Sequence, residues 1–397
     1  MAKVLVACDE YIYSYNGDFY AASQEKYDLF QRYLRVFEEM RLVVRCIPEN
    51  EFKDGRVRFD DKRIEIVDLP VFHGPNEYLS KYIEVGRRLK HITDGCDAAV
   101  LRIPSTIALR VAKKVIKAKI PYVTEVVFDA YDGMKGTRSF IEKMLWFKMD
   151  LDTRNVCYQA DGVSCVTEYY LQRRYYSKKE HHFTSHYSSL ALNASFFSCP
   201  RKFPENKKMV IAHVSNQIQY NGRKGHIEVI KALSILKSKG IYLDVIFAGK
   251  DYFNGVAKLK DLAKKMGVIE QISFPGYVSR SQLEILLERA DLYVMPTTAE
   301  GLPRVLIEAM AKGLPCVSSD VSGNPELIDS RFLCHYMDVN SLVLIIKDLV
   351  QTKDLYEQVS IDNFNNSLKY RDDILQTRRD SFYSNLKSLV VSKNNRC

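Results

Sequence analysis

The sequence AEGLPRVLIEAMAKGLPCVSSDVSGNPELI, residues 299–328, decides the fold class. The apolar run DLYVMP just before it, residues 291–296, is typical of a buried strand that ends at a proline. Apolar residues then recur at helical spacing over 302–312 and stop before Gly313, and a further strand is expected over 315–318. Strand, loop, helix and strand in this order predict a parallel α/β sheet.

Two carboxylates of this stretch, Glu300 and Glu308, stand eight residues apart across the loop and the first turns of the helix. Ligands of parallel sheets bind at the carboxyl ends of the strands, where Glu300 and Gly301 are expected. Backbone N–H groups of Gly301, Leu302 and the helix start would face an anion, because a helix N-terminus favours negative charge. Glu308 can present its carboxylate to vicinal hydroxyls such as those of a ribose. Diphosphate, sugar and ribose together describe a nucleotide sugar.

The E-G-L-P element after a strand-ending proline, the second glutamate and the later G-x-P-E-L-I resemble glycosyltransferase family 4, the retaining GT-B enzymes also called glycosyl transferases group 1. The resemblance is specific over residues 211–328 and looser over the N-terminal half. It implies an α/β fold of two Rossmann-like, doubly wound parallel-sheet domains that face each other across a cleft, with a C-terminal helix that crosses back. It also implies a nucleotide-sugar donor and neither a cofactor nor a metal.

Breaking an anomeric C–O bond to a nucleoside diphosphate requires stabilisation of charge on the leaving phosphate, by a metal or by fixed cations and N–H groups. Lys224-Gly225, after a predicted strand and before a predicted helix, resembles the K-G element of the family, whose lysine contacts the donor phosphates. The resemblance implies that Lys224 and the backbone of Gly301, Leu302 and Pro303 stabilise the phosphate. It implies that Glu300 holds donor sugar hydroxyls and that Glu308 holds the ribose.

Other candidate residues follow the family pattern less closely. Gln219 stands where the family often has a second cation, and Arg223 is the alternative donor-binding cation. Gly17, in YSYNGDFY after the first predicted strand, is expected in a loop beneath the diphosphate, and a plain turn glycine is the alternative. Glu125 and Asp129, at the end of a predicted strand, are expected to face the cleft and to bind acceptor or sugar hydroxyls.

The resemblance predicts a retaining glycosyltransferase of bacterial surface-polysaccharide assembly (capsule, O-antigen or exopolysaccharide). Its donor would be a UDP-, GDP- or TDP-sugar, and its acceptor a saccharide, lipid-linked in such pathways. A GT-B nucleotide-sugar 2-epimerase and a non-catalytic sugar-nucleotide-binding protein are the alternatives. D-L-D at Asp150–Asp152 spells the metal signature of another glycosyltransferase fold, but it lies in a helical pattern and is interpreted as a surface charge pair.

The net charge of +9 is unevenly placed. Residues 81–120 hold ten Lys and Arg against three acidic residues, and LRVAKKVIKAKI within them fits an amphipathic helix. Such a face can lie on an anionic membrane surface, and an ordinary solvated helix is the alternative. Nucleic acid is not expected as a partner, because no recognisable nucleic-acid-binding module accompanies the charge.

A chain of 397 residues is expected to form two domains. The predicted division is an N-terminal domain over 1–190, a linker over 191–206, a nucleotide-sugar domain over 207–370 and a returning helix over 371–397. Nine cysteines without CxxC pairs favour reduced thiols, and neither a signal peptide nor a membrane span is expected. We therefore expect a cytoplasmic protein, and peripheral attachment at the inner face of the membrane is the further option. Predicted strands cover 3–8, 42–46, 64–68, 98–102, 120–127, 162–166, 209–214, 242–248 and 272–274, and predicted helices cover 26–40, 107–119, 227–239, 281–290 and much of 341–391.

Overall fold

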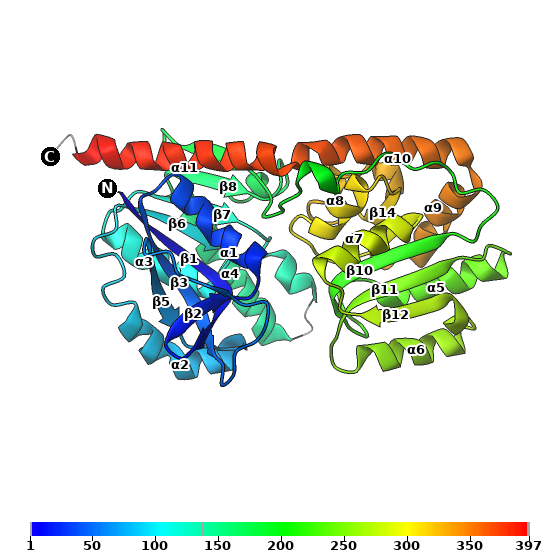
Figure 1. Cartoon of the computed structure of the whole chain (residues 1–397), viewed down its shortest axis with the longest axis horizontal. Helices are drawn as coiled ribbons and strands as arrows, with labels where there is room; N and C mark the ends of the chain where they lie inside the picture. The colour runs from blue at the N-terminus through cyan, green and yellow to red at the C-terminus, as the bar shows by residue number, and fades with distance from the viewer. Residues whose placement is uncertain (1, 137–138, 395–397) are drawn as a thin grey trace. The chain divides into compact units, whose positions relative to one another are not determined.

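The computed structural model describes residues 2–136 and 139–394, and the chain forms two compact units (Figure 1). Unit 1 comprises Met1–Tyr131, Phe140–Ser189 and Gln376–Cys397, and unit 2 comprises Asp132–Ser139 and Leu190–Leu375. The short segment Asp132–Ser139 is assigned to unit 2 although it lies within the N-terminal half of the chain, and the domain division predicted from the sequence did not include it. Each unit is built around one sheet.

Unit 1 contains a nine-stranded sheet in which β3, β1, β6, β7, β8 and β9 run parallel, with β5 parallel to β3. Only β2 and β4 at one edge are antiparallel to their neighbours. Its strands are β1 (Lys3–Tyr15), β2 (Asp18–Ala21), β3 (Glu39–Pro48), β4 (Val57–Arg58), β5 (Ile64–Leu69), β6 (Ala98–Ile103), β7 (Tyr122–Val126), β8 (Gly162–Cys165) and β9 (Phe183–His186). Its helices are α1 (Gln24–Gln31), α2 (Gly74–Arg88), α3 (Thr106–Lys117), α4 (Phe140–Tyr158) and all but the first turn of α11 (Asp372–Asn394).

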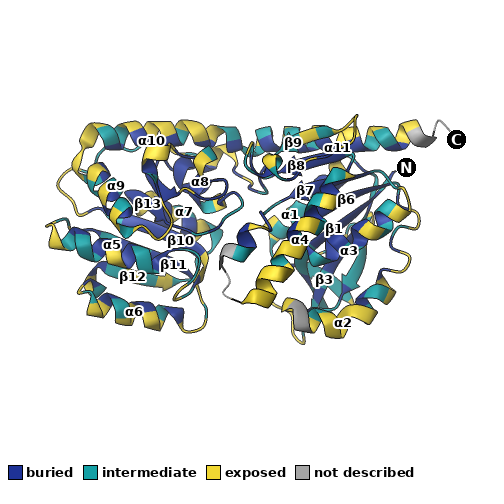
Figure 2. Ribbon diagram, turned by 180° about the vertical axis from the view of Figure 1, so that it is seen from behind, coloured by how far each residue is buried: buried dark blue, intermediate teal, exposed yellow. Residues whose placement is uncertain are grey.

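The core of unit 1 lies between the sheet and helices α2, α3 and α4. Every residue of β6, AAVLRI, is buried, as expected for a central strand that is covered on both faces. Helix α3 buries one apolar side against the sheet, including Ile107, Val111 and Val115, and its lysines point away from it. Figure 2 shows this division between buried strands and partly exposed helices.

Two predictions for the N-terminal part of unit 1 were wrong. The first strand does not end at Cys8 but continues to Tyr15, and Asn16-Gly17 form a two-residue hairpin turn into β2. Both turn residues have positive φ, 50° and 85°, which is the type I′ geometry that Asn-Gly favours. The predicted helix over 26–40 ends early, because Glu39 already pairs with Lys3 as the first residue of β3.

Helix α11 passes from unit 2 into unit 1 at Gln376. Within unit 1, its Asp380 forms an ion pair with Arg35 at 2.9 Å. Its Lys387 donates to the carbonyl of Val36 at 2.7 Å. The C-terminal helix predicted over 371–397 thus packs on the unit formed by the N-terminal residues.

Unit 2 contains six parallel strands in the order β12-β11-β10-β13-β14-β15. In chain order within the unit this is 3-2-1-4-5-6, the order of a dinucleotide-binding Rossmann sheet. Its strands are β10 (Val210–Ile218), β11 (Asp244–Asp251), β12 (Ile272–Gly276), β13 (Leu292–Met295), β14 (Cys316–Ser319) and β15 (Leu333–Cys334). Its helices are α5 (His226–Ser238), α6 (Gly255–Lys265), α7 (Arg280–Arg289), α8 (Arg304–Ala311), α9 (Val339–Gln351) and α10 (Lys353–Ser367).

One strand of unit 1 was not among the predicted strands. Phe183–His186, within the predicted N-terminal domain over 1–190, form β9, the edge strand of the sheet of unit 1. The eight cysteines that the structure describes carry free thiols, and Cys199 alone among them is exposed. Burial raises the pKa of the Cys8 and Cys157 thiols to about 12, so these side chains pack as neutral apolar groups.

Candidate active site

In unit 2, β10 and β13 are parallel neighbours in the middle of the sheet. The strands that follow β10 in the chain lie on one side of this pair, and those that follow β13 lie on the other. The chain leaves β10 toward α5 and β11 on one side, and it leaves β13 toward α8 and β14 on the other. Ligands of open parallel sheets bind at such a switch point, outside the carboxyl ends of the strands. We call residues 219–225 and 296–303, which follow β10 and β13, the switch loops.

The two switch loops are fastened to each other by backbone contacts. The carbonyl oxygen of Arg223 accepts hydrogen bonds from the Thr298 N–H at 2.8 Å and from the Thr297 hydroxyl at 3.0 Å. Gly225 has φ +76° and lies so close to β13 that a Cβ there would be 2.2 Å from the carbonyl oxygen of Pro296. Only glycine fits at this position, which explains the glycine of the K-G element physically.

The fastened loops bring Lys224 and Glu300 together. The Lys224 ammonium donates to Oε1 of Glu300, and the side chains are 30% and 13% exposed. The two residues that the sequence analysis assigned to catalysis are 76 positions apart in the chain and form one ion pair at the switch point. Each remains reachable from solvent, as a group that binds a ligand must be.

A second contact holds the backbone of the loop after β13. The Glu300 N–H donates to the Ser322 hydroxyl at 3.2 Å, and that hydroxyl donates to Oδ2 of Asp132 at 2.6 Å. The Gly323 N–H also donates to the Gly301 carbonyl at 3.1 Å. Asp132 and Ser322 are fully or almost fully buried. The sequence analysis missed both residues, since no local pattern links positions 190 residues apart.

The start of α8 differs in one detail from the expected phosphate cradle. Pro303 stands at the N-cap position and has no N–H group, so it offers no donor of its own. The available N–H groups are those of Gly301, Leu302 and the residues from Arg304 onward. Leu302 and Pro303 are buried, whereas Gly301 is partly exposed. Pro303 can therefore contribute to donor binding only by placing the start of α8, and not through an N–H of its own.

Glu308 lies on α8 and is 3% exposed. Its Oε1 accepts a hydrogen bond from the guanidinium of Arg280, the first residue of α7. Arg280 in turn lies over the ring of Phe196, 4.6 Å from its centroid. The second glutamate of the motif is therefore fixed against the neighbouring helix, a contact that the sequence analysis did not anticipate.

Two buried histidines, His213 and His226, lie close to Lys224. His226 is the first residue of α5, and its ring centroid is 4.5 Å from that of His213 on β10. The Nδ1–H of His213 donates to the Val294 carbonyl at 2.8 Å. Burial and the nearby Lys224 charge lower the pKa of His226 to about 4, so the ring is neutral at pH 7. A neutral pair adds no positive charge that would compete with Lys224 for an anion.

Glu125, a predicted acceptor or sugar ligand, lies in unit 1 at the carboxyl end of β7. It is 3% exposed, and its oxygens accept from the Arg102 guanidinium at 3.2 Å and the Tyr187 hydroxyl at 2.9 Å. Tyr33 and Tyr383 also donate to it. Burial alone would raise the pKa of Glu125, but the Arg102 and Arg32 charges and these hydrogen bonds outweigh it and keep the pKa below its ordinary value. These contacts make Glu125 a buried anchor for the helix that carries Tyr383.

Asp129 is likewise buried, and its Oδ1 accepts from the Tyr175 hydroxyl at 2.7 Å and from the Tyr131 N–H at 2.9 Å. Asp150 was expected at the surface, and this is wrong. It lies on α4 as predicted but is fully buried, where it binds the Arg174 guanidinium at 2.6 and 2.8 Å. In the described part of the chain no cluster of three or more His, Cys, Asp or Glu side chains has the geometry of a metal site.

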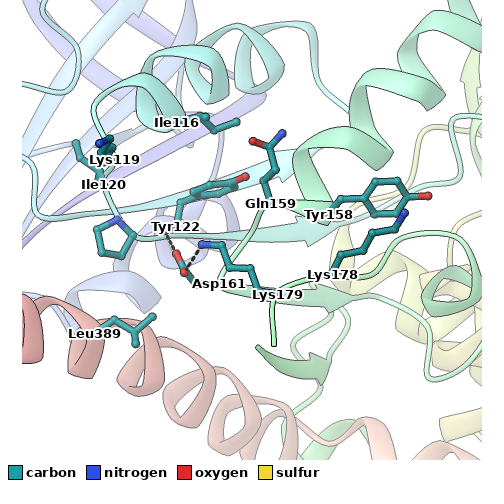
Figure 3. A pocket seen from close by; sticks show the side chains of 11 residues that line it. Ile116, Lys119, Ile120, Tyr122, Tyr158, Gln159, Asp161, Lys178, Lys179 and Leu389 are labelled. Atoms are coloured by element: carbon teal, nitrogen blue, oxygen red, sulfur yellow. Dashed lines mark hydrogen bonds and ion pairs between the residues drawn. The ribbon is translucent and has the colours of Figure 1, made fainter. Parts of the chain in front are cut away.

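A cavity in unit 1 lies away from these residues. It has a volume of about 570 Å³ and lies where β7 and β8 begin, at the edge opposite the carboxyl ends (Figure 3). Asp161 there accepts from the Tyr122 N–H at 2.8 Å and from the Lys179 ammonium at 2.5 Å. None of the predicted site residues lines this cavity. The candidate active site is therefore the open switch point of unit 2.

Comparison with known proteins agrees with this geometry. Residues 199–363 match the family model of glycosyl transferases group 1. Protein CapJ of Staphylococcus aureus is 24% identical over 400 residues, 98% of this chain and 96% of that protein. The UDP-Gal:alpha-D-GlcNAc-diphosphoundecaprenol alpha-1,3-galactosyltransferase of Escherichia coli is 32% identical over 75 residues, 19% of each chain.

Among solved structures, HepE of Anabaena in complex with UDP and glucose is similar, with a TM-score of 0.67 and 16% identity over 98% of this chain and 100% of that chain. An identity of 16% shows similarity of the fold alone, and this similarity covers both units. Residues 199–363 therefore resemble the glycosyl transferases group 1, and the two parallel-sheet units of the chain have the GT-B fold.

Proposed function

We propose that the protein is a retaining, metal-independent glycosyltransferase of family 4 that moves a sugar from a nucleotide-sugar donor to a lipid-linked saccharide in surface-polysaccharide biosynthesis. One observation carries the proposal. Lys224 and Glu300 form an ion pair at the switch point of a Rossmann-type sheet, beside the N-terminus of α8. A cation, a carboxylate and free helix N–H groups at one sheet edge suit a diphosphate joined to a sugar.

In this proposal Lys224 stabilises the charge that builds on the leaving diphosphate. The N–H groups of Gly301 and Leu302 and of the first turn of α8 add fixed dipoles, and Arg223 is the candidate second cation. Glu300 accepts hydrogen bonds from donor sugar hydroxyls once Lys224 has turned to the phosphate. The anomeric C–O bond to the diphosphate breaks, the acceptor oxygen bonds to the anomeric carbon on the same face, and the departing phosphate takes the proton of the acceptor hydroxyl, so the configuration is retained.

Glu308 is proposed to hold the ribose. Its Oε1 accepts a hydrogen bond from the Arg280 guanidinium, and this bond orients the carboxylate. A charged acceptor of this kind binds a hydroxyl pair more strongly than a neutral one does. The proposal therefore assigns Arg280 a positioning role behind the ribose site.

Support for the donor and the acceptor comes from the relatives. The HepE structure holds UDP and glucose, and the Escherichia coli relative by its name uses UDP-Gal and a diphosphoundecaprenol-linked acceptor. UDP, GDP and TDP sugars are all candidate donors. Among the described residues, no helix is long and apolar enough to cross a bilayer. A protein that takes a lipid-linked acceptor from the cytoplasmic side would then meet it at the membrane surface.

Donor screening tests the proposal. We expect one of UDP, GDP or TDP to raise the melting temperature of the protein, since ligand at 100 times its Kd adds about 2.7 kcal/mol of stability. The matching nucleotide sugar should then be consumed in the presence of a lipid-linked saccharide and EDTA, with an α-linked product from an α-linked donor. An epimerised free sugar, or turnover only when Mn²⁺ or Mg²⁺ is restored, would overturn the assigned reaction.

A further inference from the structure

One arginine of unit 1 is buried without an acidic partner. Arg32 is 7% exposed and begins the short 3-10 helix Arg32–Arg35 that follows α1. Its Nε donates to the Leu29 carbonyl at 2.7 Å, and among the described residues it has no other hydrogen bond and no carboxylate at ion-pair distance. Arginines are almost never buried unless they are paired, because an uncompensated charge inside a protein is costly. A buried cation of this kind is typical of a site that binds an anion.

The acidic residue nearest to this arginine in the site, Glu125, already has a cation of its own. Glu125 is 3% exposed and accepts from the Arg102 guanidinium at 3.2 Å. It also accepts from the hydroxyls of Tyr33 and Tyr187 at 3.1 and 2.9 Å, and burial raises the pKa of both hydroxyls, so they are neutral. Arg102 is 9% exposed and balances Glu125. Arg32 therefore adds one positive charge that these buried groups leave unbalanced.

Arg32 lines a small cavity at the carboxyl edge of the sheet of unit 1. The cavity has a volume of about 10 Å³, which is room for about one oxygen atom. Val126 and Cys165, the last residues of β7 and β8, line it together with Glu125 and Ser164. The Ser164 hydroxyl is buried and has no hydrogen-bond partner among the described residues. The end of a guanidinium and a hydroxyl, both buried donors without acceptors, thus border one cavity at the edge where ligands of parallel sheets bind.

We infer that this cavity is an oxyanion site, in which Arg32 and Ser164 bind one oxygen of a phosphate or carboxylate group. A guanidinium presents a planar fork of N–H groups that matches the oxygens of both anions, and the hydroxyl adds a further donor. The volume admits a single oxygen, so the rest of the group stays at the mouth of the cavity. Arg102 takes no part, because Glu125 already accepts from it. The low exposure of Arg32 strengthens the bond, since little water competes for the guanidinium.

The inference deepens the proposed function and rests on it for the source of the oxyanion, which we assign to the acceptor. A saccharide that is linked to its lipid through a diphosphate carries such a group, and so does a saccharide that contains a uronic acid. A neutral free sugar carries none. Glu125 was expected to bind acceptor or sugar hydroxyls, but its oxygens are occupied by Arg102 and tyrosine hydroxyls. Arg32, which lines the same cavity, is the group that remains available, so unit 1 recognises the acceptor by its charge.

Anion binding can be measured on the full-length protein without donor or acceptor. Relative to sodium chloride of equal ionic strength, inorganic phosphate and acetate should raise the melting temperature of the wild type by about 3–6 °C at ten times their Kd. Arg32→Met removes the unpaired charge and keeps the length of the side chain. Because a buried cation without a partner destabilises the fold, this variant should melt at or above the wild-type temperature in chloride. It should not respond to phosphate or acetate.

Arg35→Met is the matched control. Arg35 lies in the same 3-10 helix, but its side chain is 58% exposed and paired with Asp380 at 2.9 Å, so its variant should respond to phosphate as the wild type does. Ser164→Ala should weaken phosphate binding about tenfold, the value of one hydrogen bond to a charged group. An equal response of the wild type and Arg32→Met to phosphate would overturn the inference. So would an Arg32→Met protein that is less stable than the wild type in chloride, since the arginine would then serve the fold.

The acceptor assay separates the two sources of the oxyanion. With a neutral saccharide on a diphosphate-linked lipid, Arg32→Met should raise the acceptor KM about ten- to a hundredfold at nearly unchanged kcat if the site holds the phosphate. With a uronate-containing saccharide that lacks the diphosphate, the same loss assigns the carboxylate. A wild-type KM in both assays would overturn the acceptor role. Absence of any transfer by the wild type, with phosphate binding intact, would overturn the proposed reaction and leave the oxyanion site standing.

Discussion

The contact between Gly225 and β13 predicts that Gly225→Ala damages the active site far more than its small size suggests. Alanine at this position meets two separate penalties. Its φ of +76° is left-handed, which costs an L-residue about 1–2 kcal/mol. Its Cβ would also lie 2.2 Å from the oxygen and 2.9 Å from the carbonyl carbon of Pro296, which are backbone atoms that no side-chain rotation can move.

The same helix offers a control that separates the two penalties. Gly240 follows the C-terminus of α5 with φ +77°, almost the value of Gly225, and has no atom within 4 Å of a Cβ. Gly240→Ala should therefore lose only the conformational cost, about 1–2 kcal/mol. Gly225→Ala adds an overpacking cost of about 1–3 kcal/mol, for a total of roughly 2–5 kcal/mol. Relieving the clash requires residues 224–225 and Pro296 to move apart, which shifts Lys224 relative to the loop that carries Glu300.

Urea unfolding of both variants, followed for the transition of unit 2, measures the first effect, and turnover with saturating donor measures the second. A displacement of about 1 Å can cost a hundredfold in rate, so the Gly225 variant should lose about that factor while Gly240→Ala keeps near-normal turnover. Equal stability losses in the two variants, with equal turnover, would refute the contact between the switch loops and the reasoning built on it.

Three further predictions concern single side chains. Lys224→Ala should lower kcat by about 10²–10³ with a smaller change in donor Kd, because a preorganised group acts mainly on the transition state, and normal turnover beside an inactive Arg223→Ala would transfer the role to Arg223. Glu308→Ala should raise the calorimetric Kd of the cognate nucleoside diphosphate about ten- to a hundredfold, since a hydrogen bond to a charged group is worth about 1.5–3 kcal/mol, and unchanged affinity would leave Glu308 only its bond to Arg280. Because the pKa of His226 is lowered to about 4 in the folded protein, the unfolded chain protonates this residue first on acidification, and the free energy of unfolding should fall between about pH 6.5 and 4. In urea unfolding, His226→Phe should reduce the stability lost between pH 7 and pH 5 by about 2 kcal/mol. An equal loss in the variant and the wild type would contradict the burial of a neutral ring.

The elements that could be predicted from the sequence are those whose apolar pattern matches their burial in the folded protein. Strand β6 is apolar except for Arg102, and β13 is a short apolar run before a proline, so both were recognisable without partners. Helix α8 was recognisable because its apolar spacing begins after Pro303 and ends before Gly313. In these segments local pattern and tertiary environment agree.

The misjudged elements depend on distant residues. The pattern over 26–40 suits a helix, but Glu39 and Met40 pair with Lys3 and Val4, and the sheet overrides the local preference. Asp150 was placed on a helix correctly and at the surface wrongly, because its partner Arg174 is 24 residues away. The hairpin at Asn16-Gly17 is different, since Asn-Gly between alternating aromatic residues is a local signal for a tight turn, which was the alternative stated for Gly17.

The candidate site shows the same division. Lys224, Glu300 and Glu308 were located by their motifs, and the strand order of unit 2 explains why motifs 76 residues apart meet. Ser322 and Asp132 were not found, because they act through the Glu300 backbone and any residue with a suitable hydroxyl or carboxylate could do so. A sequence motif can identify residues whose side-chain type is required, such as Lys224 and Glu300. Residues that only hold the backbone in place, such as Ser322, are determined by the tertiary packing and leave no motif.

The two glutamates of the motif each bind a cation, but their surroundings give the two ion pairs different mobility. Both pairs are half-buried, since the cations Lys224 and Arg280 are 30% and 36% exposed, but the two carboxylates differ. Glu300 is 13% exposed at the open switch point, where a diphosphate can replace it as the partner of Lys224, whereas Glu308 is 5% exposed and would be left as a buried charge without its partner if its bond to Arg280 broke. Donor binding should therefore rearrange the Lys224 side of the site and leave the bond between Glu308 and Arg280 in place. In this reading the first glutamate exchanges partners during the reaction, and the second provides a fixed point from which the donor is aligned.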